Sequence, residues 1–369
     1  MGSPIARQSA PMNYLQLLAV IRSITGSRSH DRFPAIQPLV SVVRRDDGGA
    51  ATFVVGDAEQ AKLVLQSPCY RQFNFVERIL TIAKPERTPW IRRFCEIGLI
   101  MTDGPEHQRR RLLMQQSLDR CAAGVRAIPQ ATIAAVIEDA MAVEPCTSAG
   151  VACQLVLLLF SKSISALSGQ TSELPARDLF AVDFFNPFPT LSSLARCNEA
   201  IANCCRAIGI ESLDEADEAA VLSLLAMGVS PLHALLTSLI NVYAAALCDG
   251  AAAGEAVKRT AALDSYAVVP TNFVMRRCVA PDTISGERVD PGDIIYLFLG
   301  AATGCPFSRH TSVPFGAGQH YCSGAVLTQV MLNAVRTALK DVRSDCRRLS
   351  PSTEVQGKAA AFLTFASGT

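Results

Sequence analysis

The feature that most constrains this chain is a glycine-framed loop around one cysteine near its C-terminal end. Glycines let a backbone turn tightly and approach a flat ligand, so Gly316 and Gly318 predict a rigid turn that presents the thiol of Cys322. An apolar helical stretch, 325–335, begins after Gly324, and the dipole at its N-terminus would stabilise negative charge on the sulfur. The loop is predicted to hold a metal through one thiolate; a buried cysteine in a glycine-rich turn is the alternative.

The spacing of the residues in this loop follows a known pattern. Phe-x-x-Gly-x-His-x-Cys-x-Gly is carried by Phe315, Gly318, His320, Cys322 and Gly324. The pattern resembles the haem-binding signature of the cytochrome P450 superfamily, in a short bacterial-type member. The resemblance implies haem b as cofactor, with Cys322 as the axial thiolate ligand and the other motif residues around the haem.

Composition limits the other possibilities. The chain has 369 residues, and 49% of them are hydrophobic, which is enough to bury a large core. Basic and acidic residues number 34 and 33, so nothing indicates a nucleic-acid partner. Thirteen cysteines form no regular framework, which favours reduced thiols in a cytoplasm. The apolar run from Tyr14 to Ile21 is too short to span a bilayer, so a soluble cytoplasmic protein without a membrane segment is expected.

Hydrophobic periodicity predicts a mainly α protein with a smaller β part, an α+β class. The β-rich portions are expected at about 30–60, 270–300 and 355–369, and the helical body at about 60–262. With the haem-thiolate loop at 313–325, this order is what the P450 resemblance implies over almost the whole chain. It implies a single domain over all 369 residues, with the haem between a long distal helix and the cysteine loop.

A basic segment after Gly104 resembles the family's helix that binds the haem propionates. His107 and Arg111 lie one helical turn apart, so both can face the same carboxylate. The alternative is an ordinary basic, solvated helix face. Arg109 and Arg110 are assigned to such a face.

The segment beyond residue 270 resembles the strand that sends a further arginine to a propionate. Counting along this segment favours Arg277, with Arg276 as the alternative. Neighbouring residues alternate between the two faces of a strand, so only one of them can point inward. His320 matches the family position before the thiolate that also reaches a propionate.

The candidate distal helix spans residues 219–236 and departs from the family pattern. Gly228 fits the oxygen-binding kink, but the positions of the usual acid and alcohol are occupied by Ser230 and Pro231. Proline has no N–H or hydroxyl to offer, and it is expected to bend the helix. Gly228 and Ser230 are therefore the candidate catalytic residues, with Ser230, ordered water or the substrate as the source of protons.

Two other segments depart from the pattern that the resemblance implies. The Glu-x-x-Arg pair is missing, because residues 262–268 contain neither partner. The meander before the cysteine loop is cut down to residues 307–314. The proximal side of the haem is therefore expected to be atypical.

The resemblance implies a haem-thiolate monooxygenase that oxidises a small organic substrate in specialised metabolism with dioxygen. Ferredoxin or flavodoxin, with its reductase, would supply electrons, because the chain carries no dinucleotide fingerprint. One alternative is a peroxygenase, dehydratase or isomerase that does not use the dioxygen cycle, which Pro231 favours. A second alternative is a degenerate, non-catalytic member that binds a partner or carrier protein.

Overall fold

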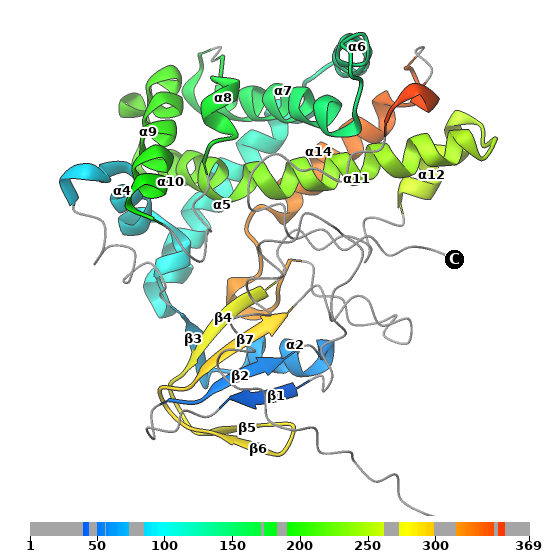
Figure 1. The fold of residues 1–369 in the computed structure, drawn as a ribbon. Helices are drawn as coiled ribbons and strands as arrows, with labels where there is room; N and C mark the ends of the chain where they lie inside the picture. Colours follow the sequence, from blue (N-terminus) through cyan, green and yellow to red (C-terminus); the bar gives the residue numbers. More distant parts are fainter. Residues whose placement is uncertain are drawn as a thin grey trace, which may run out of the picture.

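The computed structural model describes residues 40–43, 50–55, 57–73, 85–170, 173–182, 190–261, 273–298, 315–342 and 346–350. A large helical body lies on one side of the molecule, and a smaller β part lies on the other (Figure 1). This arrangement confirms the predicted α+β class. The expected C-terminal β portion, the 262–268 segment and the shortened meander lie outside the described residues.

The β part consists of a five-stranded sheet and a separate hairpin. Its strands are β1 (Val40–Val43), β2 (Thr52–Val55), β3 (Tyr70–Gln72), β4 (Phe273–Cys278), β5 (Asp282–Ile284), β6 (Glu287–Val289) and β7 (Ile294–Phe298). The sheet order is β1-β2-β7-β4-β3, with β2 and β7 parallel and the other neighbours antiparallel. Strands β5 and β6 form the hairpin. The sheet therefore joins segments from the beginning and the end of the chain.

Helix α2 (Ala58–Gln66) packs with the apolar residues of this sheet. Asp57 caps its first turn by accepting a hydrogen bond from the backbone N–H of Gln60, at 2.8 Å. Its buried residues Val64 and Leu65 belong to the same apolar cluster as the inward residues of β2 and β7. The β part thus has a small core of its own, next to the large core of the helices.

The helical body comes from the middle of the chain and one C-terminal helix. Its helices are α4 (Pro89–Ile97), α5 (Gly104–Arg126), α6 (Gln130–Met141), α7 (Ser148–Ser168), α8 (Ala176–Leu179), α9 (Leu191–Ile208), α10 (Glu215–Ser223), α11 (Val229–Cys248), α12 (Ala253–Thr260) and α14 (Ala325–Ala338). Short turns, η1 (Pro85–Arg87), η2 (Leu99–Met101), η3 (Ile210–Ser212), η6 (Gly318–His320) and η7 (Cys346–Arg348), lie between or after them. The large apolar cluster joins residues from most of these helices.

Two helices of the body are apolar on almost all sides. These are α7 and the continuous helix Glu215–Cys248, and both are long and apolar enough to cross a membrane by length and composition. Their most apolar windows are 50% and 78% buried inside the protein, which is the usual environment of a core helix. In Figure 1 they lie next to each other across the body.

The helix from Glu215 to Cys248 is interrupted by a π-helical turn, η4 (Leu224–Gly228), between α10 and α11. Pro231 lies in the first turn of α11, where its missing N–H removes a hydrogen bond to the preceding turn. A π turn lets the backbone absorb such a missing bond without breaking the helix. The irregularity expected from Pro231 is therefore a π turn directly before it.

Candidate functional site

The cysteine loop is a compact turn that ends at the first residue of α14. Gly316 and Gly318 have φ of 74° and 70°, a conformation that favours glycine. The N–H of Cys322 donates to the carbonyl of Phe315 at 2.8 Å, which closes the turn. A side chain at Gly318 would meet the backbone of Leu65 in α2, so this glycine also allows the loop to approach the β part closely.

Cys322 lies three residues before the first residue of α14. The residue is exposed, yet protein atoms surround its thiol closely enough that desolvation raises its pKa. The backbone N–H groups of Gly324 and Ala325, at the start of α14, lower the pKa in part, and so does the charge of Arg111. Hydrogen-bond donors at the start of α14 therefore lie beside the sulfur and would stabilise the negative charge that it would carry as a metal ligand.

His107 and Arg111 lie on the face of α5 that meets the loop. The His107 side chain is 2% exposed, and its Nδ1 has no hydrogen-bond partner among the described residues. Its ring meets that of His320 edge to face, with centroids 4.4 Å apart. Burial, together with the charges of His320 and Arg111, lowers the pKa of His107 to about 4, so the ring is neutral at physiological pH.

Arg111 reaches the main chain of the loop. Its Nη1 donates to the carbonyl oxygens of Tyr321, at 2.6 Å, and Gln319, at 3.3 Å. These carbonyls lie on either side of His320. The sequence assigned Arg111 to a haem carboxylate and did not indicate this contact.

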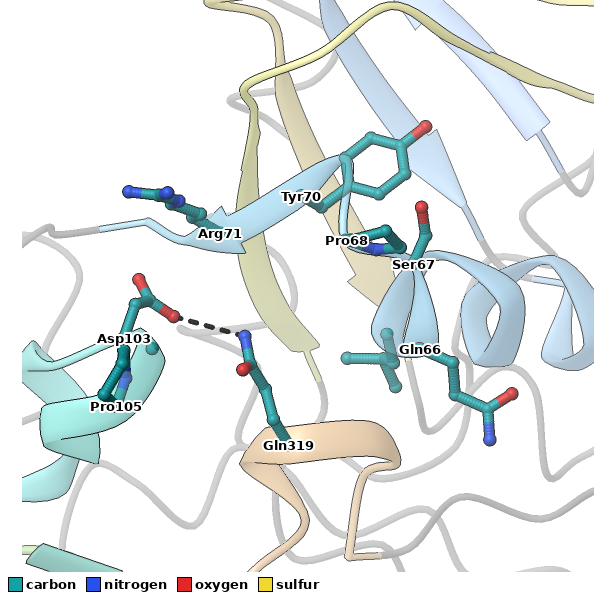
Figure 2. Close-up of a pocket in the computed structure, with 10 residues that line it drawn as sticks. Gln66, Ser67, Pro68, Tyr70, Arg71, Asp103, Pro105 and Gln319 are labelled. Carbon is teal, nitrogen blue, oxygen red and sulfur yellow. Dashed lines mark hydrogen bonds between the residues drawn. The ribbon is translucent and has the colours of Figure 1, made fainter. Parts of the chain in front are cut away.

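Asp103, which immediately precedes α5, is a site residue that sequence reasoning missed. Its side chain makes no capping hydrogen bond to α5. Instead its Oδ1 accepts from Nε2 of His320 at 2.8 Å and from Nε2 of Gln319 at 3.4 Å, as Figure 2 shows for Gln319. The only signal was an aspartate at a helix start, and that position normally indicates a cap.

Residues of α2, β3 and the start of α5 line a pocket beside this contact. Its volume is about 480 Å³, and Arg71, Asp103 and Gln319 are among its polar lining residues (Figure 2). The pocket lies where the helical body and the β part meet next to the loop. It therefore adjoins the contact between Asp103 and Gln319.

The two candidate arginines of β4 point in opposite directions. Arg276 is 4% exposed, and burial lowers its pKa to about 10 although the charge of Asp103 raises it in part. Arg277 is exposed, and its guanidinium lies over the ring of Phe73, 5.3 Å from the centroid. The structure therefore turns Arg276, the alternative, toward the site and turns the favoured Arg277 away from it.

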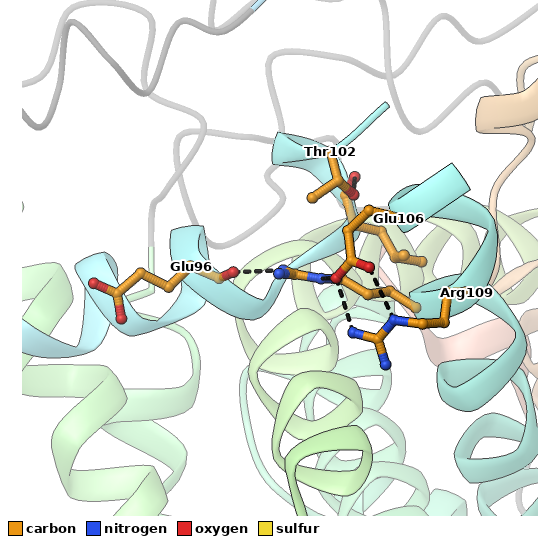
Figure 3. A network of polar contacts seen from close by, with 6 residues as sticks. Glu96, Thr102, Glu106 and Arg109 are labelled. Carbon is orange, nitrogen blue, oxygen red and sulfur yellow. Dashed lines mark hydrogen bonds and ion pairs between the residues drawn. The ribbon is translucent and has the colours of Figure 1, made fainter. Parts of the chain in front are cut away.

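Arg109 and Arg110 face away from the loop. Both pair with Glu106, at 2.8 Å and 2.5 Å, and Arg110 also donates to the carbonyl of Glu96 (Figure 3). Hydrogen bonds from Arg109 and Arg110 lower the pKa of Glu106 to about 2. In this polar network around Glu106, Arg109 is exposed and Arg110 is half-buried.

Gly228 and Ser230 lie in the Glu215–Cys248 helix, in η4 and at the start of α11. A side chain at Gly228 would come within 3.1 Å of the ring of Phe160 in α7, so close packing of helices already accounts for this glycine. Among the described residues, no hydrogen bond, ion pair or ring contact links 224–231 to the cysteine loop. The structure thus brings the cysteine loop together with site residues of α5 and β4. Gly228 and Ser230 make no described contact with that group.

Neither family models nor curated proteins match this sequence. Solved structures do match. P450BioI in complex with hexadec-9Z-enoic acid ligated acyl carrier protein is 14% identical, with a TM-score of 0.61 over 87% of this chain and 92% of that chain. CYP109Q5 from Chondromyces apiculatus is 15% identical, with a TM-score of 0.60 over 86% and 89%.

A third match is the LnmZ cytochrome P450 hydroxylase from the leinamycin biosynthetic pathway of Streptomyces atroolivaceus. It is 16% identical, with a TM-score of 0.54 over 85% of this chain and 94% of that chain. All three similarities extend over most of both chains at low identity, so they concern the course of the backbone. Together with the α+β architecture and the loop around Cys322, they show that this chain has the cytochrome P450 fold.

Proposed function

We propose that the protein is a haem-thiolate enzyme that oxidises a small organic molecule, with Cys322 as the axial ligand of haem b. The observation that carries the proposal is the group of side chains around the cysteine loop. Among the described residues, Arg111 and Arg276 bring two positive charges to this group, and Asp103 is its one carboxylate. The buried Nδ1 of His107 has no described partner. A dianionic cofactor with two carboxylates suits this group.

Each residue of the group has a definite part in this proposal. Arg276 and His107 would bind haem carboxylates, because both are buried and neither is paired with a carboxylate at ion-pair distance in the described structure. Nε and Nη2 of Arg111 would do the same, since only its Nη1 donates to the loop there. His320 would support them while its Nε2 is held by Asp103.

The chemistry follows from the thiolate. A thiolate axial ligand pushes electron density to the iron of a bound haem and favours O–O cleavage. The N-terminus of α14 supports the charge of that sulfur through the backbone N–H groups of Gly324 and Ala325. On the distal side, the Ser230 hydroxyl is the proton donor that this chain offers in place of an acid-alcohol pair.

The proposal extends to the kind of substrate and to the electron donor. The leinamycin enzyme is by its description a biosynthetic hydroxylase, and a role in specialised metabolism is proposed here on that likeness. A ferredoxin or flavodoxin, with its reductase, would supply electrons in a bacterial cytoplasm. P450BioI was solved with a ligated acyl carrier protein, and a carrier-bound substrate is one form that the substrate of this enzyme can take.

A second candidate function rests on Pro231 and the π turn before it. If Ser230 delivers no proton, the protein is a haem-thiolate peroxygenase, dehydratase or isomerase. A test compares three reactions of one substrate: reduced ferredoxin with dioxygen, hydrogen peroxide alone, and anaerobic incubation with neither. Product in the first reaction only supports the monooxygenase, product with peroxide alone supports the peroxygenase, and anaerobic product supports a lyase or isomerase. A chain that binds no haem would leave the non-catalytic, partner-binding alternative.

A further inference from the structure

We propose that Asp103 and Arg111 form a clamp that fixes residues 319–321 and thereby positions Cys322. Toward Cys322 both residues act by positioning, since neither side chain contacts the thiol in any described hydrogen bond, and the clamp uses only Nη1 of Arg111 while Nε and Nη2 are the nitrogens proposed above for a haem carboxylate. The clamp is a property of the folded chain without its cofactor. Only its consequence for iron ligation rests on the function proposed above.

The first half of the clamp is the guanidinium of Arg111. It donates from one nitrogen to the carbonyls of Gln319 and Tyr321, so it bridges two peptide groups of the loop. A guanidinium carries its donors in a rigid plane, and charge-assisted hydrogen bonds of this kind are stronger than neutral ones. Because the carbonyl of Tyr321 belongs to the peptide bond that leads into Cys322, Arg111 fixes the backbone directly before the ligand.

The second half is the carboxylate of Asp103. It accepts hydrogen bonds from the side chains of His320 and Gln319, so it holds the loop through its side chains, whereas Arg111 holds the main chain. Asp103 immediately precedes the first residue of α5, and Arg111 lies on that helix. The two contacts therefore attach the loop to one rigid element at two points.

Within the described residues, the loop is also attached through Ser323, whose hydroxyl donates to the sulfur of Met114 in α5 at 3.9 Å, and through the close approach of Gly318 to α2. Its internal backbone hydrogen bonds run from the Tyr321 N–H to the Gly318 carbonyl, at 3.1 Å, from the Cys322 N–H to the Phe315 carbonyl, and from the Ala325 N–H to the Cys322 carbonyl, at 3.3 Å. Gly316 and Gly318 supply backbone freedom that a folded turn has to give up. External contacts from α5 reduce that freedom before any cofactor is present, which is the general advantage of a preorganised site.

This assignment differs from a role in binding haem carboxylates. A residue that only binds such a carboxylate has to be a donor, whereas Asp103 is an acceptor. Without the negative charge of Asp103 beside it, Arg276 would bind a haem carboxylate at least as well. Substitution of Asp103 therefore separates the two roles: haem affinity is kept or raised, and the position of Cys322 is lost.

The test uses hydrogen–deuterium exchange of backbone amides in the full-length protein as purified. Asp103→Ala and Arg111→Ala should each accelerate exchange at Tyr321 and Cys322 about tenfold, which corresponds to ~1.4 kcal/mol of lost local stability. Arg109→Ala, on the same helix but paired with Glu106, should leave both amides unchanged. Unchanged exchange at these amides in both clamp variants would overturn the proposal, and so would acceleration that extends equally through α7.

A spectroscopic readout distinguishes the clamp from the proposed function. In Asp103→Ala with bound haem, the thiolate-type fraction of the carbon-monoxide spectrum should fall while total haem is kept. A full thiolate-type spectrum in that variant, at wild-type haem content, contradicts the clamp. If the wild-type chain binds no haem, the proposed function is wrong, and the exchange experiment still decides for or against the clamp.

Discussion

The two sides of the proposed haem site are built in different ways. On the side of Cys322, polar groups from α5 and β4 converge on one short loop, and most of them are buried or hydrogen-bonded to each other. On the side of α11, the helix is largely apolar, and the π turn at Leu224–Gly228 and Pro231 in the following turn depart from a regular core helix. Among the described residues, the proximal side thus carries the residues suited to hold a cofactor, while the distal side carries Ser230 and Pro231 in place of the acid-alcohol pair of the P450 pattern. Cofactor binding and the reaction performed can therefore be tested separately.

The largest effect is expected at the ligand itself. Cys322→Ser should abolish the thiolate-type spectrum completely, because a serine hydroxyl cannot replace a thiolate at iron. Cys248, the other exposed cysteine of the described residues, is the matched control, and Cys248→Ser should keep the spectrum. Carbon-monoxide difference spectra of the two purified variants measure this. A wild-type spectrum in Cys322→Ser would remove the basis of the whole comparison.

The next largest effect is expected on the distal side. If Ser230 delivers protons, Ser230→Ala should lower turnover about 10²- to 10⁴-fold, the range of general acid catalysis, with haem content unchanged. Turnover and coupling of reducing equivalents to product, with ferredoxin and dioxygen, measure this. Turnover close to wild type would mean that ordered water or the substrate supplies the protons. The distal side would then contribute no proton-donating side chain, in contrast to the polar proximal side.

On the proximal side, Arg276→Ala should weaken haem binding by at least about tenfold, since a charge-assisted hydrogen bond in a buried site contributes ~1.5–3 kcal/mol. Arg277→Ala is the control on the same strand, because Arg277 is exposed and stacks on Phe73. Haem titration of both purified variants compares them. Loss of affinity in Arg277→Ala with none in Arg276→Ala would reverse the assignment.

The smallest expected effect concerns pH. The folded pKa of His107 is about 4, below its usual 6.5, so the unfolded chain takes up its proton first as the pH falls. His107 therefore contributes stability in full above about pH 6.5 and loses it as the pH falls toward 4. The free energy of unfolding should therefore decline less steeply between pH 6.5 and 4 in His107→Gln, by up to ~1.4 kcal/mol per pH unit. Denaturant unfolding of the haem-free protein across this range measures the slope, and equal slopes in the two proteins would show that His107 is not held neutral.

The loop and the α5 face could be predicted from the sequence because their signals are local. A glycine-framed cysteine before an apolar helix, and a histidine and an arginine one turn apart, need no tertiary information. The β-rich portions expected at about 30–60 and 270–300 contain β1, β2, β4 and β7 of the sheet. The P450 fold followed from the resemblance of the loop and is confirmed by the solved structures.

What the sequence did not settle depends on contacts between distant segments. The inward face of β4 is fixed by Val274 and Cys278, which pack in the β core and share their side of the strand with Arg276. This alternation was present in the sequence, but counting along the segment assigned Arg277 instead. The role of Asp103 depends on a loop far along the chain, so no local pattern could distinguish it from a helix cap.

The central claim is that Cys322 is the thiolate ligand of a haem held by the residues around it. The most direct measurement is a carbon-monoxide difference spectrum of the reduced, full-length wild-type protein after purification with haem. The proposal predicts the red-shifted Soret band typical of thiolate ligation, at one haem per chain. A protein that binds no haem, or whose spectrum is that of a nitrogen-ligated or unligated haem, would contradict it.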